Sequence, residues 1–423
     1  MEGFSGIFSQ VEDPRTGNAR RHDLCELLVI ALCSCLCGGT TCTEMAEFAE
    51  DKEPFLREFL TLKNGLPSHD TFSRLFRLLD PVAFGACFSE FMRAFSQQTT
   101  GVVAIDGKTL RRSFDTASEK SALHMVSAWS CEERLVLAQI ATDEKSNEIT
   151  AVPQLLRFLN LEGRTVTTDA MSCQRDIAEQ IVDQGGHYVL SLKRNQPTLF
   201  DDVARYFADP EARVLACKPT VDADHGRIET RNAVVSSDVD WLQDIHGWPG
   251  LKAIGAVRRT RRPKGANAGP PTTETAYYLL SEPMTPERLN QYARDHWGVE
   301  NRLHWVLDVD MNEDRARNRC DNGPQNLAIL KHMAINKLNA EPSKLPIRRK
   351  LKKADRSDAF LRRSVLNSMA YMTCPTKALG FGLGKEHCVP IRLTQTPTRA
   401  SVCRHGGHGH PTARRSGLSS VAS

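Results

Sequence analysis

The sequence predicts an α/β protein with a mixed five-stranded sheet and covering helices, preceded by an all-helical N-terminal domain. Residues 102–208 follow the order strand, strand, strand, helix, strand, helix, strand, helix. Residues 1–98 instead place their apolar side chains at helical spacing. The 423-residue chain is 40% hydrophobic and 25% charged, which excludes uniform disorder, collagen and coiled coil. A length of this size predicts about two to four domains.

The hydrophobic segments predict no membrane partner. The longest apolar run, at 24–37, contains Glu26, and a membrane-spanning helix needs about 20 apolar residues. The N-terminus lacks the basic and apolar regions of a secretory signal. We therefore expect a cytoplasmic protein.

The helices of the N-terminal domain have recognisable starts. Thr41-x-x-Glu44 is a capping box, and residues 67–70 open a further helix. That helix places Arg74 and Arg77 opposite its apolar face. The two arginines fit either a DNA recognition helix or a solvated basic face.

The strands of the predicted sheet are short apolar runs. They lie, in chain order, at 102–105, 123–129, 135–142, 164–168 and 187–193. Helices are predicted at 150–159, 174–183 and 196–208. The first strand ends at Asp106 and the fourth at Asp169. In a mixed sheet of this order the two strands can lie side by side, so both carboxylates can point into one site.

A β-rich insert is predicted at about 211–285. Its strand-like pieces are 227–236, 251–259 and 273–280, and the last two flank a Gly- and Pro-rich loop. Basic side chains cluster at this loop: Arg258, Arg259, Arg261, Arg262 and Lys264. A helix at 286–308 is expected to follow.

The C-terminal part begins with a basic segment at 341–369. Residues 331–363 hold eleven Lys and Arg against three acids, and the run Arg348, Arg349 and Lys350 is its densest part. We interpret the segment as a nucleic-acid contact, with a solvated basic face as the alternative. Residues 370–423 are rich in Gly, Ser, Thr, Pro and His and predict a disordered tail.

Three acids form the candidate catalytic site. Asp106 and Asp169 are joined by Glu300, on the helix that follows the insert. Carboxylates that converge in this way bind hard divalent cations through oxygen. A pair of such ions about 4 Å apart can promote phosphoryl transfer. The alternative is that these are ordinary surface acids.

Other motifs fail or are weaker. Gly107-Lys108-Thr109 resembles the end of a P-loop, but its first glycine would fall on Val102. Asp308-x-Asp310-x-Asn312 lacks the glycine and the final glutamate of an EF-hand loop. His296, Glu300 and His304 share a helix face, which leaves open a zinc hydrolase site. We favour histidines that contact phosphate or tune the carboxylate.

Long motifs in the right order resemble the ISAs1 family of bacterial insertion-sequence transposases (H-repeat-associated proteins), within the IS4-like DDE group. The motifs are FSQVEDPR at 8–15, NGLPSHDTFSRLFRLLDP at 64–81, AIDGKTLRRS at 104–113, TTDAMSCQRDIAEQIVDQGGHYVLSLKRNQPTLF at 167–200, DHGRIETR at 224–231 and RDHWGVENRLHWVLDVDMNEDRAR at 294–317. The resemblance runs from about residue 8 to about residue 340. It implies an associated helical domain at 1–98 and an RNase H-like catalytic domain at 99–340.

The resemblance also implies the roles of the acids. The first acid of the family matches Asp106, the second Asp169 and the third Glu300, which together hold two Mg²⁺ ions that Mn²⁺ can replace. Asp106 is expected to bridge both ions. The Tyr-x₂-Arg-x₃-Glu-x₆-Lys signature of the IS4 group is not kept, so the candidate basic helpers are His296, Arg302 and His304.

The implied function is DNA transposition. The enzyme would cut strands at the terminal repeats of its element and transfer the ends into target DNA, as a homo-oligomer on nucleoid DNA. Lys108, Lys193 and the basic loop at 258–264 are the candidates for backbone contacts. The alternatives are a metal-dependent nuclease without strand transfer and a DNA-binding protein whose catalysis has decayed.

Overall fold

The computed structural model describes residue 8 and residues 11–96, 100–114, 121–142, 148–223, 226–264 and 269–366. The predicted tail at 370–423 lies outside these residues. The predicted fold class is confirmed: a mixed α/β sheet of RNase H-like strand order follows an N-terminal helical region.

The N-terminal helices are a 3-10 turn, η1, and five α-helices. Their bounds are Gly17–Arg20 (η1), Leu24–Leu36 (α2), Cys42–Asp51 (α3), Glu53–Leu56 (α4), His69–Leu78 (α5) and Pro81–Ser96 (α6). The predicted capping box opens α3, with the Thr41 side chain accepting from the Glu44 N–H and the Glu44 carboxylate accepting from the Thr41 N–H. Local capping chemistry therefore sets where this helix begins.

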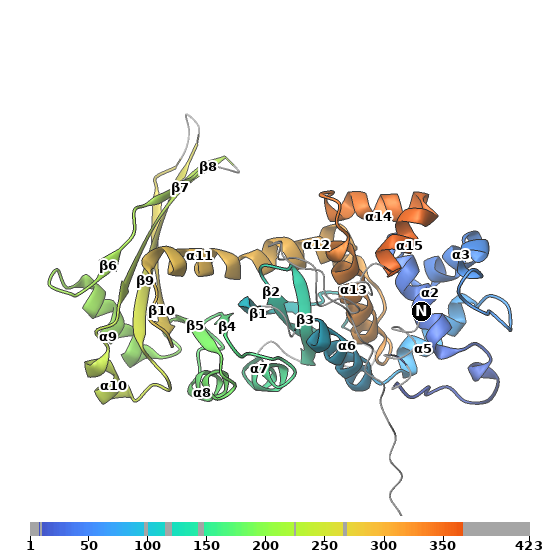
Figure 1. Ribbon diagram of the computed structural model, residues 1–423, viewed down its shortest axis with the longest axis horizontal. Coiled ribbons are helices and arrows are strands. Elements are labelled where there is room, and N and C mark those ends of the chain that lie inside the picture. Colours follow the sequence, from blue (N-terminus) through green and yellow to red (C-terminus); the bar gives the residue numbers. More distant parts are fainter. Residues whose placement is uncertain are drawn as a thin grey trace, which may run out of the picture. The chain divides into compact units, whose positions relative to one another are not determined.

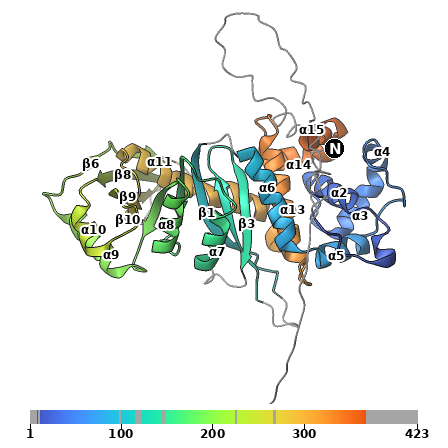
Figure 2. The same ribbon diagram turned by 60° about the horizontal axis from the view of Figure 1, so that its bottom comes forward.

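Three C-terminal helices pack with this N-terminal group. They are α13 (Gly323–Ala340), α14 (Ile347–Arg356) and α15 (Asp358–Leu366). Helix α13 contacts α2, α5 and α6 and also reaches β3 (Leu135–Thr142), and Figure 2 shows it next to α6, with α2 and α5 beyond. The Asn326 side chain on α13 donates to the carbonyls of Phe76 and Leu79. One hydrophobic core thus unites the beginning and the end of the described chain.

The five predicted core strands are present and have the expected directions. Their bounds are Gly101–Thr109 (β1), His124–Ser130 (β2), Leu135–Thr142 (β3), Arg164–Thr168 (β4) and His187–Leu192 (β5). The order is β3-β2-β1-β4-β5. Strands β1, β2 and β3 are antiparallel neighbours, whereas β4 is parallel to both β1 and β5.

The β-rich insert does not interrupt the sheet but extends it. Strand β10 pairs antiparallel with β5, and the order continues β10-β9-β8-β6, with β7 also on β8. The bounds are Leu215–Ala216 (β6), Thr220–Asp222 (β7), Arg227–Ser236 (β8), Ala253–Pro263 (β9) and Thr272–Leu280 (β10). The predicted hairpin of the last two strands is confirmed. Pairing with β10 satisfies the backbone groups that β5 would otherwise expose at an edge.

Helices cover both faces of the sheet. Helix α11 (Pro286–His296) crosses one face, where it contacts β1, β4, β8 and β9. Figure 1 shows α7 (Glu148–Leu156) and α8 (Arg175–Asp183) below the other face. Helices α9 (Pro197–Ala208) and α10 (Asp240–His246) belong to the extended half.

The helix predicted at 286–308 is present but irregular: a turn at Trp297 interrupts it, and a π-helical stretch lies in its second half. Helix α11 ends at His296, a π-helical turn, η3, spans Glu300–His304, and α12 spans Trp305–Val309. Single π-turns inside helices occur frequently at functional sites. Here the turn carries the predicted third acid. A short 3-10 turn, η4 (Glu313–Arg315), follows α12.

Candidate active site

The first two acids lie at neighbouring strand positions. Strand β1 is parallel to β4, with Ile105 opposite Thr168. The next residues along the two strands are Asp106 and Asp169, so the predicted adjacency of the first and fourth strands is confirmed. Asp169 directly follows β4, and its Oδ1 accepts from the Ser172 N–H at 3.2 Å.

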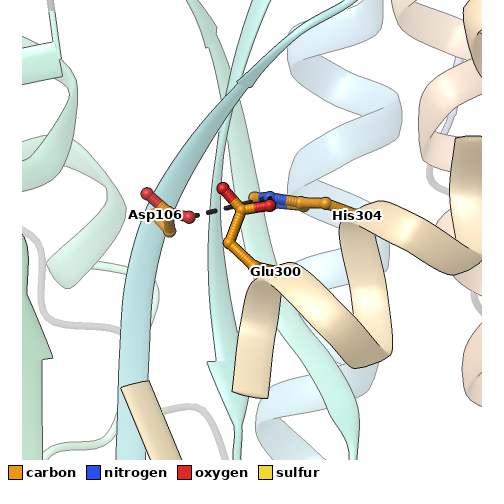
Figure 3. A group of neighbouring side chains, drawn as sticks. All are labelled: Asp106, Glu300 and His304. Carbon is orange, nitrogen blue, oxygen red and sulfur yellow. Dashed lines mark ion pairs between the residues drawn. The ribbon is translucent and has the colours of Figure 1, made fainter. Parts of the chain in front are cut away.

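The third acid comes from η3. Val299 and Leu303 are fully buried and anchor the turn in the core, which leaves Glu300 at the pocket and directs His304 inward. Nδ1 of His304 lies 3.6 Å from Asp106 Oδ2 and 3.5 Å from Glu300 Oε2. Figure 3 shows the imidazole directed at the two carboxylates. One ligand atom from each of these three residues lies within 4.8 Å of the others.

Asp169 stands outside that trio but lines the same pocket. The pocket holds about 200 Å³ and is lined by Asp106, Asp169, Glu300 and residues of α11 and the extended sheet. Its basic side chains are Lys193 after β5, Arg231 on β8 and Arg259 on β9. Acids and cations that line one pocket suit a phosphodiester that is held beside a metal centre.

The pKa values of two of the acids are shifted in opposite directions. Burial, together with the neighbouring Glu300 and Asp169 carboxylates, raises the pKa of Asp106 to about 6, although His304 acts against this increase. The hydrogen bond from His304 lowers the pKa of Glu300. Carboxylates this close repel one another, which leaves one of them partly protonated near neutral pH. A divalent cation would neutralise this repulsion. The donor set therefore fits a divalent metal.

The raised pKa of Asp106 predicts how Asp106→Asn changes the stability of the metal-free protein. A folded-state pKa of about 6, above the ordinary 3.8, means that the folded state binds an extra proton between about pH 4 and pH 6. Stability is then lost as the pH rises through this window. We expect Asp106→Asn to be more stable than wild type at pH 7, by on the order of 1–3 kcal/mol, with the gain vanishing below about pH 4.

Urea unfolding in EDTA at pH 3.5 and pH 7 measures this difference. The exposed Asp244 supplies the control variant Asp244→Asn, which keeps Asp106 and should therefore unfold like wild type at both pH values. Equal stability of wild type and Asp106→Asn at both pH values would contradict the raised pKa.

Two side chains on the other side of β1, those of His124 and Glu148, require glycine at position 107. A Cβ at this position would overlap the His124 imidazole and the Glu148 carboxylate, which contact each other. Thr109 Oγ1 also lies 2.9 Å from His124 Nδ1. The buried His124 and Glu148 side chains therefore pack against β1 next to Asp106 and leave no room for a side chain at position 107.

The DNA contact predicted for Lys108 is not supported. Its side chain is 10% exposed, and its ammonium lies 2.7 Å from Asp308 Oδ1 and 2.8 Å from Glu313 Oε2. Asp314 is a third partner at 3.8 Å. Two residues on from Asp106, the lysine thus ties β1 to the segment after Glu300. Glu313 and Asp314 are the nearest acids in the sequence that could replace Glu300 as the third acid. The ion pairs place both of them around Lys108 and not beside Asp106 and His304.

The candidate helpers near Glu300 divide into three positions. His296 lines the pocket, with Nδ1 3.1 Å from Thr167 Oγ1, and burial lowers its pKa to about 4. A neutral imidazole could contact phosphate only through its N–H and without a charge. His304 is buried and faces the acids. Arg302 is exposed and is not among the residues that line the pocket.

The basic loop residues alternate between two faces of the hairpin. Arg259 faces the pocket, pairs with Glu274 at 2.6 Å and lies over the Trp297 ring at 5.5 Å. Arg261 pairs with Glu229 at 3.0 Å. The exposed members are Arg258, Arg262 and Lys264.

Sequence reasoning missed Arg231, Glu274 and Trp297 as pocket residues. Arg231 ends the DHGRIETR motif, and Trp297 lies three residues before Glu300 in HWGVE, so motif membership was an available signal for both. For Glu274 only the strand register, which places it opposite Arg259, identifies the position.

The predicted basic segment forms α14 and α15, and its arginines and lysines differ in exposure. Arg348 and Arg349 are exposed. Lys350 is 4% exposed, and its ammonium donates to the carbonyls of Leu338 and Glu341 at 2.7 Å each. The DNA contact predicted for Lys350 is therefore not supported, because this lysine holds the end of α13.

The predicted recognition arginines lie on the exposed side of α5, whose Phe72, Leu75 and Phe76 are buried. Arg74 is exposed. Arg77 is also exposed but pairs with Asp321 at 2.7 Å, just before α13. The two arginines therefore differ in how freely they could reach a partner.

Family models identify the chain from these same regions. Residues 97–337 match the transposase DDE domain, and residues 6–92 match the region described as DDE_Tnp_1-associated. The chain belongs to the family of DDE transposases, which are enzymes acting on DNA. Membership implies dependence on a divalent metal, for which Asp106 and Glu300 supply carboxylate donors.

Curated relatives agree with the family. The chain is 38% identical to the "H repeat-associated putative transposase YhhI" of Escherichia coli K12 over 79% of this chain and 89% of that one. It is 36% identical to the "Putative transposase YncI" of Escherichia coli O157:H7 over 85% and 94%. A solved piggyBac transposase synaptic complex with hairpin DNA aligns over 90% of this chain and 82% of that chain, with a TM-score of 0.40 and 13% identity.

No helix in the described ranges has both the length and the apolar character that a membrane crossing needs.

Proposed function

We propose that this DNA transposase serves an insertion sequence of the ISAs1 family, cuts strands at the terminal repeats and joins the freed ends to target DNA. The observation that carries the proposal is the convergence of Asp106 and Glu300 within 4.8 Å, with Asp169 lining the same pocket. Their placement at adjacent strand ends and on η3 matches the order of acids in the family.

Asp106, Asp169 and Glu300 would hold two Mg²⁺ ions, with Mn²⁺ as a substitute. When bound, such ions activate an oxygen nucleophile and stabilise the leaving oxygen at phosphorus. Asp106 is central because it faces both other acids. The chain's own cations at the pocket, Lys193 and Arg259, would position the phosphate next to the acids. The exposed Arg258, Arg262 and Lys264 would hold the backbone of the same DNA further out.

A strand-transfer assay tests this proposal. The purified chain is incubated with labelled terminal-repeat DNA, a supercoiled target and Mg²⁺, and labelled target is the expected product. Cleavage without joining would favour the nuclease alternative. Binding without cleavage, in the presence of Mg²⁺ or Mn²⁺, would favour the decayed DNA-binding protein. Sedimentation with and without terminal-repeat DNA measures the proposed homo-oligomer.

The basic helix α14 is proposed as a phosphate-binding surface. Arg348→Ala with Arg349→Ala should lower the slope of log affinity against log salt by about 0.9 for each lost contact. Terminal-repeat and random DNA should be weakened alike, because phosphates carry no sequence information. Lys350 is left unchanged, since its removal would disturb α13.

Titrations by fluorescence anisotropy at several salt concentrations provide the slopes. The matched control is Arg157→Ala with Arg205→Ala, two exposed arginines outside α14. If the α14 variant keeps the wild-type slope, the segment is only a solvated surface.

Sequence specificity is proposed to reside in the N-terminal helices. A bidentate Arg–guanine contact discriminates by about 1–3 kcal/mol, so Arg74→Ala should weaken binding to the terminal repeat by roughly 5- to 150-fold and leave binding to random DNA nearly unchanged. Arg77→Ala should instead lower thermal stability slightly, because it removes an exposed ion pair with Asp321. Competition binding and thermal melting of both variants separate these roles. A terminal-repeat footprint unchanged in Arg74→Ala would assign α5 to packing.

A further inference from the structure

His304 has an environment that the role of a phosphate contact does not explain. Its side chain is 5% exposed, so it cannot present a charge to DNA at the surface. Its Nδ1 faces Asp106 and Glu300, and its Nε2 is buried without a hydrogen-bond partner among the described residues. Burying a polar ring costs free energy unless a partner compensates. The two acids are the polar partners that this ring has.

The distances from the His304 nitrogen to the two carboxylates are close to those within a ligand shell. An ion bound at about 2.1 Å from nitrogen and oxygen donors separates adjacent donors by about 3.0 Å in an octahedron and about 3.4 Å in a tetrahedron. Nδ1 lies 3.6 Å and 3.5 Å from the two carboxylate oxygens. A contraction of a few tenths of an ångström would bring the imidazole into the shell.

We propose that His304 is a direct ligand of the metal held by Asp106 and Glu300, which rests on the proposed function of this site. The π-helical turn places the ring there, because Glu300 and His304 begin and end it. An imidazole ligand favours a transition metal over a purely oxygen-seeking cation. The site is therefore selective for Mn²⁺ relative to Mg²⁺, beyond what three carboxylates would give.

Mn²⁺ itself is the probe. The full chain is titrated with Mn²⁺ by electron paramagnetic resonance, and the nitrogen modulation of the bound ion is recorded by electron spin echo. Wild type should show modulation from one histidine nitrogen. His304→Ala should lose it and bind Mn²⁺ at least roughly tenfold more weakly, the scale at which groups around a metal act. Its Mg²⁺ affinity, from competition, should change less.

Two variants sharpen the assignment. His304→Asn places an oxygen near the position of Nδ1 and should recover part of the affinity without the nitrogen signal. His296→Asn changes the other histidine of the same pocket, which is bound to Thr167, and should retain both the signal and the affinity. If His304→Ala does not fold, the wild-type spectrum compared with a ¹⁵N-histidine sample still decides.

The outcomes separate the two proposals. Mn²⁺ binding that Asp106→Asn abolishes but that shows no nitrogen modulation would overturn the role of His304 and leave the metal site intact. Mn²⁺ binding unchanged in both Asp106→Asn and Glu300→Gln would overturn the site itself. Modulation that persists in His304→Ala would assign the nitrogen to another histidine and also overturn the inference.

Discussion

Glu300→Gln is expected to abolish strand cleavage while DNA binding survives. Gln keeps the shape of Glu300 but removes the charge that a metal requires. Losing several kcal/mol of charge stabilisation corresponds to roughly 10³-fold in rate. The side chain is 56% exposed, so the fold should not suffer. Cleavage of labelled terminal-repeat DNA gives the rate, and a gel-shift titration gives the affinity.

The control is Glu287→Gln, an exposed acid at the other end of α11, which should cut at the wild-type rate. Glu313→Gln offers a second comparison, since Glu313 is the partner of Lys108. It should lower thermal stability more than it lowers the cleavage rate of the folded fraction. Normal cutting by Glu300→Gln together with a folded but inactive Glu313→Gln would move the third acid to position 313.

Lys108→Met is expected to destabilise the protein by about 3–5 kcal/mol, the usual result of removing one partner of a buried ion pair. The Glu313 side chain is only 2% exposed, so its carboxylate would stay buried without its cation. Asp308 would lose the same partner. Because these acids follow Glu300 in the chain, the metal site should loosen as well. Urea unfolding measures the loss.

A double-mutant cycle with Glu313→Gln isolates the pair. The double variant should be less destabilised than the sum of the two single variants, because the unpaired charge is then absent. Lys252→Met, at an exposed lysine, is the control and should unfold like wild type. If Lys108→Met had wild-type stability, the ion pairs of Lys108 would not hold the fold together, and Lys108 would again be a candidate for contact with DNA.

Local chemistry made part of this structure predictable. The predicted strand at 164–168 has the bounds of β4, and Thr41 caps α3 with Glu44 as expected. Both features depend on neighbours within a few residues. The position of Asp106 next to β4 was predictable too, because few strand orders satisfy right-handed crossovers.

Distant pairings were not predictable. Nothing in the local pattern of 272–280 says that this strand will pair with β5, and nothing in the composition of a basic run separates Lys350 from Arg349. The partners of Lys350, the carbonyls of Leu338 and Glu341, become neighbours only after α13 and α14 pack. The same holds for Lys108, whose carboxylates are about two hundred residues away in sequence. The π-helical turn η3 within the long helix was not predictable either, because side-chain periodicity alone does not distinguish it from α-helix.

The pairing of β10 with β5 limits how the pocket can adapt to DNA. Asp106 and Arg259 belong to strands joined by an uninterrupted ladder, from β1 through β4, β5 and β10 to β9. No flexible linker separates the strand of Asp106 from the strand of Arg259 along this ladder, so the two cannot close like the halves of a hinge. Any change in their spacing must come from side-chain rotation or from α11 and η3, which lie over the sheet. The distance between the backbones that carry Asp106 and Arg259 is therefore set by the sheet before DNA binds.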